Sequence, residues 1–455
     1  MREDRRSALK LLGSGLAGTA ALVAGGGALS TPARDAPPRR QPPAVPGRGD
    51  GFLWGVAGAA YQVEGNNYAS DLWPMEYLQP SVFKEPSGDA DDTWNRVHED
   101  IALAARLGFN SYRMSVEWSR IVPERGHVSR AALDYYRRVL ESIRAHGMLP
   151  VVTYMHFTSP RWFAAAGGFE VKEGLAPWLD YARILTEELG GLIGLATTFN
   201  EPNLGALVSY DPAVAKMVPY IRMARQQAAK ALGHERYAPP MLGSYQVQQP
   251  IMIEAHNRAR EVIRHASGNR LPVGVTLSLN EERGKAGYVA AKEERVMLPW
   301  LRAEGDWVGV QNYTWSEVGP GQMDLPRAKD VKATQMGYPY APESVAQVVR
   351  AVAQHWSKPI YVSENGVATE NDEERVAFID RALAGLAKCL ADGIDLRGYI
   401  HWSLLDNWEW FSGYGPKFGL VQVDRQTFRR TPKPSAAHLG QLARKAGWAR
   451  RARSG

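Results

Sequence analysis

The stretch GLATTFNEPN, residues 194–203, predicts a buried strand that ends on a carboxylate. Its first six residues are small, apolar, aromatic or β-branched, which is typical of a strand covered on both faces. Asn200 and Glu201 follow, and Pro202 fixes the next backbone angle. A single glutamate at a strand end is usually a solvated structural residue. The other strand ends therefore decide whether Glu201 has a function.

Seven further runs of β-forming residues share this pattern and alternate with longer amphipathic stretches. They are FLWGVAG (52–58), NSYRMSV (110–116), LPVVTYMH (149–156), PVGVTLS (272–278), DWVGVQNY (306–313), PIYVSEN (359–365) and RGYIHWS (397–403). The amphipathic stretch 92–108 repeats Val97 and Ile101 at helical spacing. Eight parallel strands that alternate with helices and close on themselves predict an α/β fold, a single (β/α)8 TIM barrel, over residues 50–443.

An open doubly wound sheet is the alternative architecture. It needs a Gly-rich phosphate-binding turn after the first strand, whereas residues 57–67, AGAAYQVEGNN, lack the G-x-G-x-x-G pattern. The barrel is therefore favoured. Residues 203–271 are expected to form a long excursion between the fourth and fifth strands, with helices around 215–232 and 250–267.

The positive charge of the chain lies at its two ends. Of the net charge of +6, residues 1–50 carry +4 and residues 444–455 carry +5, which leaves −3 for residues 51–443. A nucleic-acid-binding domain distributes basic residues across its fold. No nucleic-acid partner is therefore expected, and residues 444–455 are expected to be a solvated basic tail.

The first 30 residues are similar to an export signal. A charged start precedes a weakly hydrophobic Gly/Ala-rich stretch that ends in small residues. The pair Arg5-Arg6, with Leu9 and Lys10, resembles a twin-arginine signal, although Ala8 stands where an aromatic residue is common. A membrane anchor, or a basic start without a function, is the alternative reading of this segment.

Two further observations bear on location. Residues 31–49 are rich in Pro and Arg and predict an unstructured linker. No later segment has the roughly 18 uninterrupted apolar residues that a spanning helix needs. We therefore expect an exported protein, extracellular or in the cell envelope, without stable membrane insertion after removal of the signal.

Two glutamates end strands in matching positions. Glu201 ends the fourth strand and Glu364 ends the seventh, in YVSENG, and in a barrel these ends form the active face. Strands on opposite sides of the barrel bring the two carboxyl groups face to face, which glycosidic bond cleavage requires. One carboxyl must stay protonated near neutral pH and the other ionised, and Arg113 is a candidate for lowering the pKa of the ionised one.

Other polar and aromatic residues stand within a strand, at strand ends or close after them. They are Gln62, Arg113, His156, Asn200, Gln311, Tyr313 and Trp402. Near the C-terminus, residues 401–419 (HWSLLDNWEWFSGYGPKFG) interleave several of the 14 Trp with Asp406, Asn407 and Glu409. A single Trp is usually a core residue, but a tract that alternates Trp with acids and amides matches the flat faces and hydroxyl rims of sugars.

With these residues, the sequence resembles glycoside hydrolase family 1, the β-glucosidase family, over about residues 51–440. The resemblance is carried by FLWGVAGAAYQVEG, TFNEPN, YVSENG, GYIHWSLLDNWEW and KFGLVQVD, in the family's order. It implies a retaining mechanism in which Glu201 is the general acid/base and Glu364 the nucleophile, with carboxyl groups about 5–5.5 Å apart.

The resemblance also implies roles for the surrounding residues. It implies that Arg113 and Tyr313 hold Glu364, that Trp402 forms the platform for the first sugar, and that Phe418 lines the rim. The residues implied to bind the hydroxyls of that sugar are Gln62, His156, Asn200, Glu409 and Trp410. Gln311 is also expected to contact the substrate.

Two related branches differ at these positions. The thioglucosidase branch lacks the acid glutamate, so the presence of Glu201 favours O-glycosides. The 6-phosphoglycosidase branch replaces the glutamate of the Trp-rich tract, and Glu409 repels phosphate, so a non-phosphorylated sugar is favoured.

The chain also departs from the family. Gln311 stands where the family usually has Asn, and Phe157 stands where Trp is frequent. Residues 203–300 lack the usual pattern after NEP, so they are expected to shape an unusual leaving-group side.

Three functions are compatible with this pattern. The first is hydrolysis of β-D-glycosides. The second is transglycosylation from the same covalent intermediate to an acceptor hydroxyl, and the third is non-catalytic carbohydrate binding on a barrel scaffold, which the presence of both glutamates disfavours.

No metal or cofactor is expected, because His98, His127 and His146 lack ligand spacing. The single cysteine, Cys389, allows no intrachain disulfide and is expected to pack in a helix. Neither the glycone nor the oligomeric state follows from the sequence.

Overall fold

The computed structural model describes residues 51–444 of the 455-residue chain. The predicted export signal and linker, residues 1–49, and the tail from residue 445 onward lie outside the described residues. Within the described range, no helix combines the length and the apolar composition that crossing a membrane requires.

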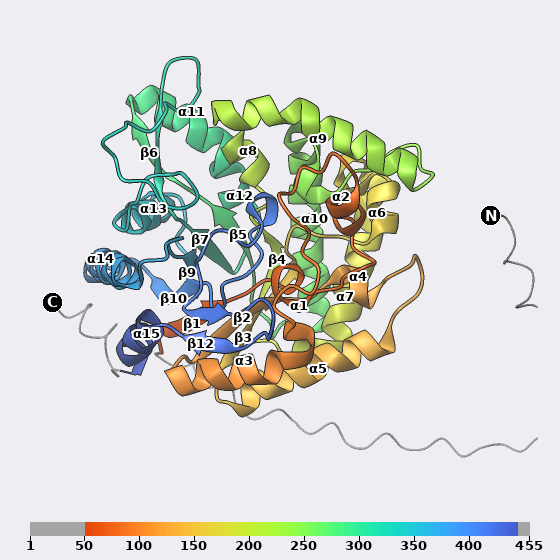
Figure 1. Ribbon diagram of the computed structural model, residues 1–455, viewed down its shortest axis with the longest axis horizontal. Coiled ribbons are helices and arrows are strands. Elements are labelled where there is room, and N and C mark those ends of the chain that lie inside the picture. Colours follow the sequence, from red (N-terminus) through yellow and green to blue (C-terminus); the bar gives the residue numbers. More distant parts are fainter. Residues whose placement is uncertain (1–50, 445–455) are drawn as a thin grey trace, which may run out of the picture. The chain divides into compact units, whose positions relative to one another are not determined.

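Eight parallel strands close into the predicted barrel (Figure 1). They are β1 (Leu53–Ala57), β2 (Ser111–Ser115), β3 (Leu149–Met155), β4 (Leu195–Asn200), β5 (Val273–Ser278), β7 (Trp307–Gln311), β9 (Ile360–Asn365) and β10 (Leu396–Trp402). Their order around the barrel is β1-β10-β9-β7-β5-β4-β3-β2, so the first and last strands are neighbours. All eight predicted strands are confirmed, each within two residues of the expected bounds.

Long helices surround the barrel (Figure 1). They are α3 (Thr93–Leu107), α5 (Arg130–Ala145), α7 (Leu175–Leu189), α10 (Tyr245–Ala266), α11 (Ala286–Val296), α13 (Ser344–Ala353), α14 (Asp372–Ala391) and α15 (Pro434–Arg444). The pairs α3 and α5, α5 and α7, α7 and α10, α13 and α14, and α14 and α15 pack side by side, and α15 contacts α3, so the first and last helices of this layer meet. The predicted helix over 92–108 corresponds to α3, and Cys389 is fully buried in α14, as expected.

Alternate strand residues build two apolar regions. Leu149 and Val151 belong to a small cluster inside the barrel, together with residues of the other strands and with Trp402. Val152 and Tyr154 belong to a much larger cluster between the barrel and the helices. The strands are therefore covered on both faces, which explains why they are continuous apolar runs in the sequence.

The strands β4 and β9 are separated by β5 and β7. The two strands are therefore three positions apart in a ring of eight. Strands on directly opposite sides, as the sequence suggested, would be four positions apart. The carboxyl ends of β4 and β9 therefore converge obliquely on the same face, and this is where Glu201 and Glu364 lie.

The excursion after β4 is helical, as predicted. It contains α8 (Leu204–Val208), α9 (Pro212–Ala231) and α10, and α10 begins at Tyr245, five residues earlier than expected, because the helix runs through Pro250. Two short pairings were not predicted. They are a parallel pair of β6 (Glu281–Gly284) with β8 (Trp315–Val318) and an antiparallel pair of β11 (Val421–Val423) with β12 (Arg430–Pro432).

The remaining helices are short. They are α1 (Ala60–Glu64), α2 (Trp73–Tyr77), α4 (Trp118–Ile121), α6 (Arg161–Ala165) and α12 (Leu298–Leu301), with a 3-10 turn over Trp410–Ser412.

Candidate active site

Every residue predicted for the site lies on a barrel strand, in most cases at its carboxyl end, or in the segment that follows it. They are Gln62 in α1, Arg113 on β2, His156 after β3, Asn200 and Glu201 at the end of β4, Gln311 and Tyr313 at the end of β7, Glu364 on β9, Trp402 on β10, and Glu409, Trp410 and Phe418 after β10. All except Tyr313 and Trp410 are buried. Segments far apart in the sequence thus supply one face of the barrel.

Glu364 is held on both of its oxygens. Arg113 forms an ion pair with Oε1, and the Tyr313 hydroxyl donates a hydrogen bond to Oε2. Burial raises the pKa of Glu364, and the Arg113 charge and the Tyr313 hydrogen bond oppose that rise. Arg113 therefore lowers the pKa of Glu364, which is the predicted direction. The contacts of Arg113 and Tyr313 also fix the position of both carboxylate oxygens.

Asn200 is the centre of a buried hydrogen-bond network. Its Oδ1 accepts from Arg113 Nη2 at 2.6 Å, from Gln311 Nε2 at 2.8 Å and from Thr276 Oγ1 at 3.2 Å. Arg113 consequently links the residue before Glu201 to Glu364. The three bonds also fix the orientation of the Asn200 amide.

Gln311 takes the place where the family resemblance implies Asn. Its longer side chain donates to Asn200, and its Oε1 is buried with no hydrogen-bond partner among residues 51–444. An unpaired buried oxygen is costly, so this atom is well suited to accept a hydrogen bond from a ligand.

Glu201 occupies a different environment. Its backbone has a left-handed φ of 46°, and its amide donates to Thr276 O at 2.8 Å, which turns the side chain out of the strand. Burial, followed by the nearby charge of Glu364, raises the pKa of Glu201 to about 8, while Ser278 and Arg113 lower it. These causes favour the protonated form of Glu201 at neutral pH, beside a second carboxyl that is paired with a cation.

The segment after β1 and the segment after β10 meet in this site. Gln62 Nε2 donates to Asn407 Oδ1 at 2.9 Å and to Trp408 O at 2.8 Å, and Gln62 Oε1 is a second buried oxygen without a partner in the described chain. Glu409 Oε1 accepts from Trp402 Nε1 at 3.2 Å. Burial raises the pKa of Glu409 to about 8, opposed by the Trp402 bond and supported by the charge of Glu364.

Four rings form a nearly parallel series in the site. Trp402 stacks with His156 (5.9 Å between centroids, 16° between planes), His156 with Trp410 (6.2 Å, 12°), and Trp410 with Tyr61 (5.9 Å, 7°). Burial, together with the Arg113 charge, holds the pKa of His156 well below its usual range. The imidazole is therefore neutral and suited to bind a hydroxyl group. Phe418 lies against Tyr313 (5.6 Å, 74°).

Several residues of the site were not predicted from the sequence. Thr276 bonds Asn200 from the interior of β5, and Asn407 fixes Gln62 from the Trp-rich tract. Tyr61 and Tyr338 add aromatic surface, and the charges of Glu409 and Glu201 contribute to the raised pKa of Tyr338. Asn407 stands in the tract that the sequence singled out, but Tyr338 is in a loop with no strand end or motif to mark it.

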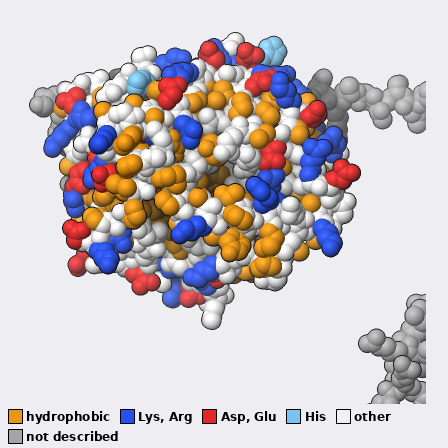
Figure 2. Space-filling view, turned by 90° about the horizontal axis from the view of Figure 1, so that it is seen from above, with side chains coloured by type: hydrophobic (Ala, Val, Ile, Leu, Met, Phe, Trp, Pro, Cys, Tyr) orange, Lys and Arg blue, Asp and Glu red, His pale blue; other side chains and the backbone are white. Residues whose placement is uncertain are grey.

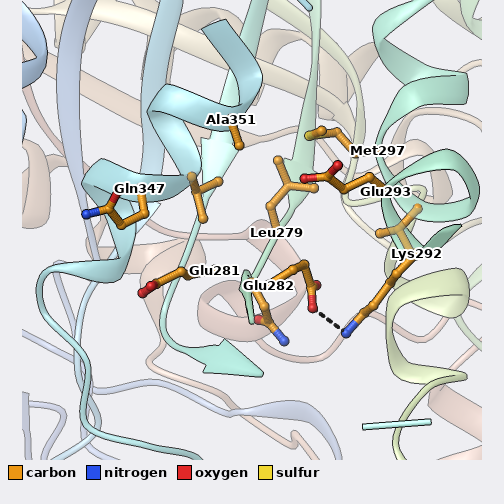
Figure 3. A pocket seen from close by; sticks show the side chains of 11 residues that line it. Leu279, Glu281, Glu282, Lys292, Glu293, Met297, Gln347 and Ala351 are labelled. Carbon is orange, nitrogen blue, oxygen red and sulfur yellow. Dashed lines mark ion pairs between the residues drawn. The ribbon is translucent and has the colours of Figure 1, made fainter. Parts of the chain in front are cut away.

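A separate cavity of about 220 Å³ is lined mostly by residues of the segment 203–300, which was predicted to shape the leaving-group side (Figure 3). Its lining comes from β6, α11 and α13, and neither Glu201 nor Glu364 contributes to it. In Figure 3 Lys292 points toward Glu282, and their atoms are 2.7 Å apart. Lys292 also pairs with Asp324 at 2.8 Å. The cavity therefore borders a buried ion-pair cluster that joins the loops around β6 and β8.

Helix α9 carries apolar side chains that remain exposed, all of them within residues 217–223. They are Met217, Val218, Tyr220 and Met223. Its second half is buried through Ala224 and Ala228, in a cluster that also contains Tyr61 and Trp408. Figure 2 looks down on the side of the molecule where α9 lies, and hydrophobic side chains are prominent there among Lys and Arg. The atypical region thus places α9, a helix with several exposed apolar side chains, beside loops of the site.

The described part of the chain offers no metal-binding cluster. Among residues 51–444, no three His, Cys, Asp or Glu side chains are grouped so that they could hold a metal ion.

Comparison with known proteins agrees with this geometry. The family model for glycosyl hydrolase family 1 matches residues 48–296 and 300–448. β-Glucosidase A of Thermotoga maritima is 30% identical over 429 residues, which cover 85% of this chain and 95% of the relative.

Solved structures show the same arrangement. The apo structure of beta-glucosidase 1317 superposes with a TM-score of 0.86 at 59% identity and covers 87% of this chain and 99% of that one. The β-glucosidase from Thermotoga maritima in complex with deoxynojirimycin gives a TM-score of 0.75 at 25% identity, with 86% and 97% covered.

Proposed function

Because the chain belongs to glycosyl hydrolase family 1 and is a retaining β-glycosidase acting on O-glycosyl bonds, we propose that Glu201 and Glu364 carry out its double displacement. The observation that carries the assignment is the contrast between the two carboxyl groups. Glu364 is paired with Arg113 and accepts from Tyr313. Glu201 has its pKa raised to about 8 by burial and by the charge of Glu364.

In the first step Glu364 attacks the anomeric carbon of the sugar. The bond from that carbon to the glycosidic oxygen breaks, and Glu201 gives its proton to this oxygen, so that the aglycone leaves as an alcohol. A covalent glycosyl-enzyme remains on Glu364, with the two carboxyl groups expected about 5–5.5 Å apart.

In the second step water replaces the aglycone. Formation of the ester removes the negative charge of Glu364, which removes one of the causes that raise the pKa of Glu201. Glu201 is now ionised and takes a proton from the water. The water oxygen attacks the anomeric carbon at the same time, and the bond from that carbon to Glu364 breaks. The sugar leaves with retained configuration.

We propose a β-D-glucoside as the substrate class. The buried oxygens of Gln62 and Gln311, which have no partner within residues 51–444, accept hydrogen bonds from the hydroxyls of the first sugar. Asn200, His156, Glu409 and Trp410 bind further hydroxyls. Trp402 lies under the ring and Phe418 at the rim. The names of the relatives, which are β-glucosidases, support glucose as this sugar.

Covalent trapping tests the assignment. A 2-deoxy-2-fluoro β-glucoside with a good leaving group should add one fluoroglycosyl unit to the protein, and mass spectrometry of peptides should locate it on Glu364. The Glu364→Ala variant should neither turn over substrate nor gain the mass. Labelling at another carboxylate, or undiminished turnover by Glu364→Ala, would contradict the nucleophile assignment.

We also propose that residues 1–30 direct export by the twin-arginine route and that residues 31–49 connect this signal to the barrel domain. The pair Arg5-Arg6 supports this proposal. In a host with that route, the activity should leave the cytoplasm. The double variant Arg5→Lys, Arg6→Lys should stay inside, and equal export of this variant would contradict the proposal.

A further inference from the structure

Trp410 lies in a loop that needs external support. The loop, residues 408–414, follows β10, and Trp410 itself has a left-handed φ of 51°. This backbone region is disfavoured for a bulky residue, so the surroundings must hold the indole in place. The ring of Tyr61 stacks on one side of it, 5.9 Å away and tilted by 7°.

Tyr61 is itself fixed by a buried carboxylate. Its hydroxyl donates to Oε1 of Glu76 in α2, and the backbone amide and hydroxyl of Ser87 donate to Oε2 of Glu76 at 2.7 and 2.8 Å. Tyr61 is 2% exposed and Glu76 is 3% exposed. Three donors therefore satisfy one carboxylate, and the Tyr61 ring has little freedom to move.

The segment that holds Glu76 also holds the Trp410 loop. Glu85 O accepts from Trp408 Nε1 at 3.0 Å, and Glu85 Oε1 accepts from the Tyr414 amide at 2.8 Å. At Gly413, whose φ is +62°, an added Cβ would lie 2.4 Å from Glu85 Oε1. The loop after β1 and the loop after β10 are therefore fitted closely together around Trp410.

We propose that Tyr61 and Glu76 are positioning residues for Trp410 and so set how tightly the first sugar is bound. Tyr61 transmits the position through its ring, and Glu76 through its hydrogen bond to the Tyr61 hydroxyl. The inference rests on the proposed sugar-binding role of Trp410. Neither residue touches the reacting atoms.

A double-mutant cycle tests this inference. The variants are Tyr61→Phe, Trp410→Phe and the two combined, with binding of deoxynojirimycin measured by calorimetry and kcat and KM measured with an aryl β-glucoside. Tyr61→Phe keeps the ring and removes one hydrogen bond, so Kd and KM should rise about three- to tenfold with a smaller change in kcat. In the Trp410→Phe background the same substitution should change Kd less than twofold.

Two further variants complete the design. Glu76→Gln places an amide group against the Ser87 donors and should raise Kd at least as much as Tyr61→Phe. Tyr154→Phe is the matched control, because Tyr154 is a fully buried tyrosine whose hydroxyl bonds Thr186 at 2.8 Å away from the site. Tyr154→Phe should lower the melting temperature about as much as Tyr61→Phe does and leave the Kd for deoxynojirimycin unchanged.

The outcomes separate this inference from the proposed function. An unchanged Kd in Tyr61→Phe, or an equal effect with and without Trp410, would overturn the positioning role even if hydrolysis is normal. A protein that binds deoxynojirimycin with the expected coupling but hydrolyses no β-glycoside would overturn the proposed function and leave the positioning role standing.

Discussion

The guanidinium of Arg113 forms a buried ion pair with Glu364, and side-chain exposure is 1% for Arg113 and 5% for Glu364. A second guanidinium nitrogen of Arg113 bonds Asn200, so one residue of β2 connects the strand ends of β4 and β9. This link couples the charge state of Glu364 to the geometry beside Glu201.

Arg113→Gln should therefore impair both chemistry and stability. Without the cation, the pKa of Glu364 rises further, so the acidic limb of the kcat/KM profile should move to higher pH and kcat/KM at pH 7 should fall about 100-fold or more. Breaking a buried pair costs about 3–5 kcal/mol, which thermal unfolding would register. Arg381→Gln, which breaks an exposed pair with Glu343, is the control and should cost at most about 1 kcal/mol.

The pH profile should report Glu201. Only its protonated form donates to the leaving group, and that form is lost as pH rises through about 8. With a poor leaving group, kcat/KM should fall about tenfold per pH unit above that value. Glu409 has its pKa raised to the same range, so the control is Glu201→Ala with a dinitrophenyl glucoside, which needs no acid. If kcat/KM of Glu201→Ala with this substrate still falls as pH rises above about 8, Glu409 causes the fall.

Removal of the acid should select among leaving groups. Glu201→Ala should slow the first step strongly for alkyl glucosides and weakly for dinitrophenyl glucoside, because only the former need protonation. A plot of log kcat/KM against leaving-group pKa should become steeper. Undiminished hydrolysis of poor leaving groups would rule Glu201 out as the acid.

Gln311→Asn tests the departure at β7. The shorter amide cannot keep the 2.8 Å bond to Asn200, so kcat/KM should fall about three- to tenfold, the effect of one hydrogen bond. Thermal unfolding should change little. Gln354→Asn, at an exposed site after α13, is the control. Equal or higher activity of Gln311→Asn would show that the bond has no role.

The barrel was predictable because each strand is buried on both faces. A strand such as Val273–Ser278 must be apolar along its whole length, and this leaves a signal that neighbouring helices do not obscure. The pairing of β6 with β8 leaves no such signal, because both strands are short and only partly buried. The start of α10 was placed too late, since Pro250 is also a common first residue of helices.

The sequence marks candidate site residues where an unusual residue type stands at a strand end. Glu201 and Glu364 stand out because a carboxylate there is unusual. Thr276 and Glu76 do not, because their importance comes from partners, Asn200 and Tyr61, that are remote in the sequence. Contacts of this kind become visible only when the chain has folded.

The contact between Gln62 and Asn407 joins residues 345 positions apart. During synthesis, Asn407 is added long after Gln62. Synthesis of the intervening residues takes roughly 20 to 70 seconds at about 5–20 residues per second. Until β10 emerges beside β1, the barrel is an open sheet with two unpaired edges. The contact on the sugar side of the site can consequently form only late in synthesis, and ribosome-bound chains that end before β10 need protection from edge-to-edge association.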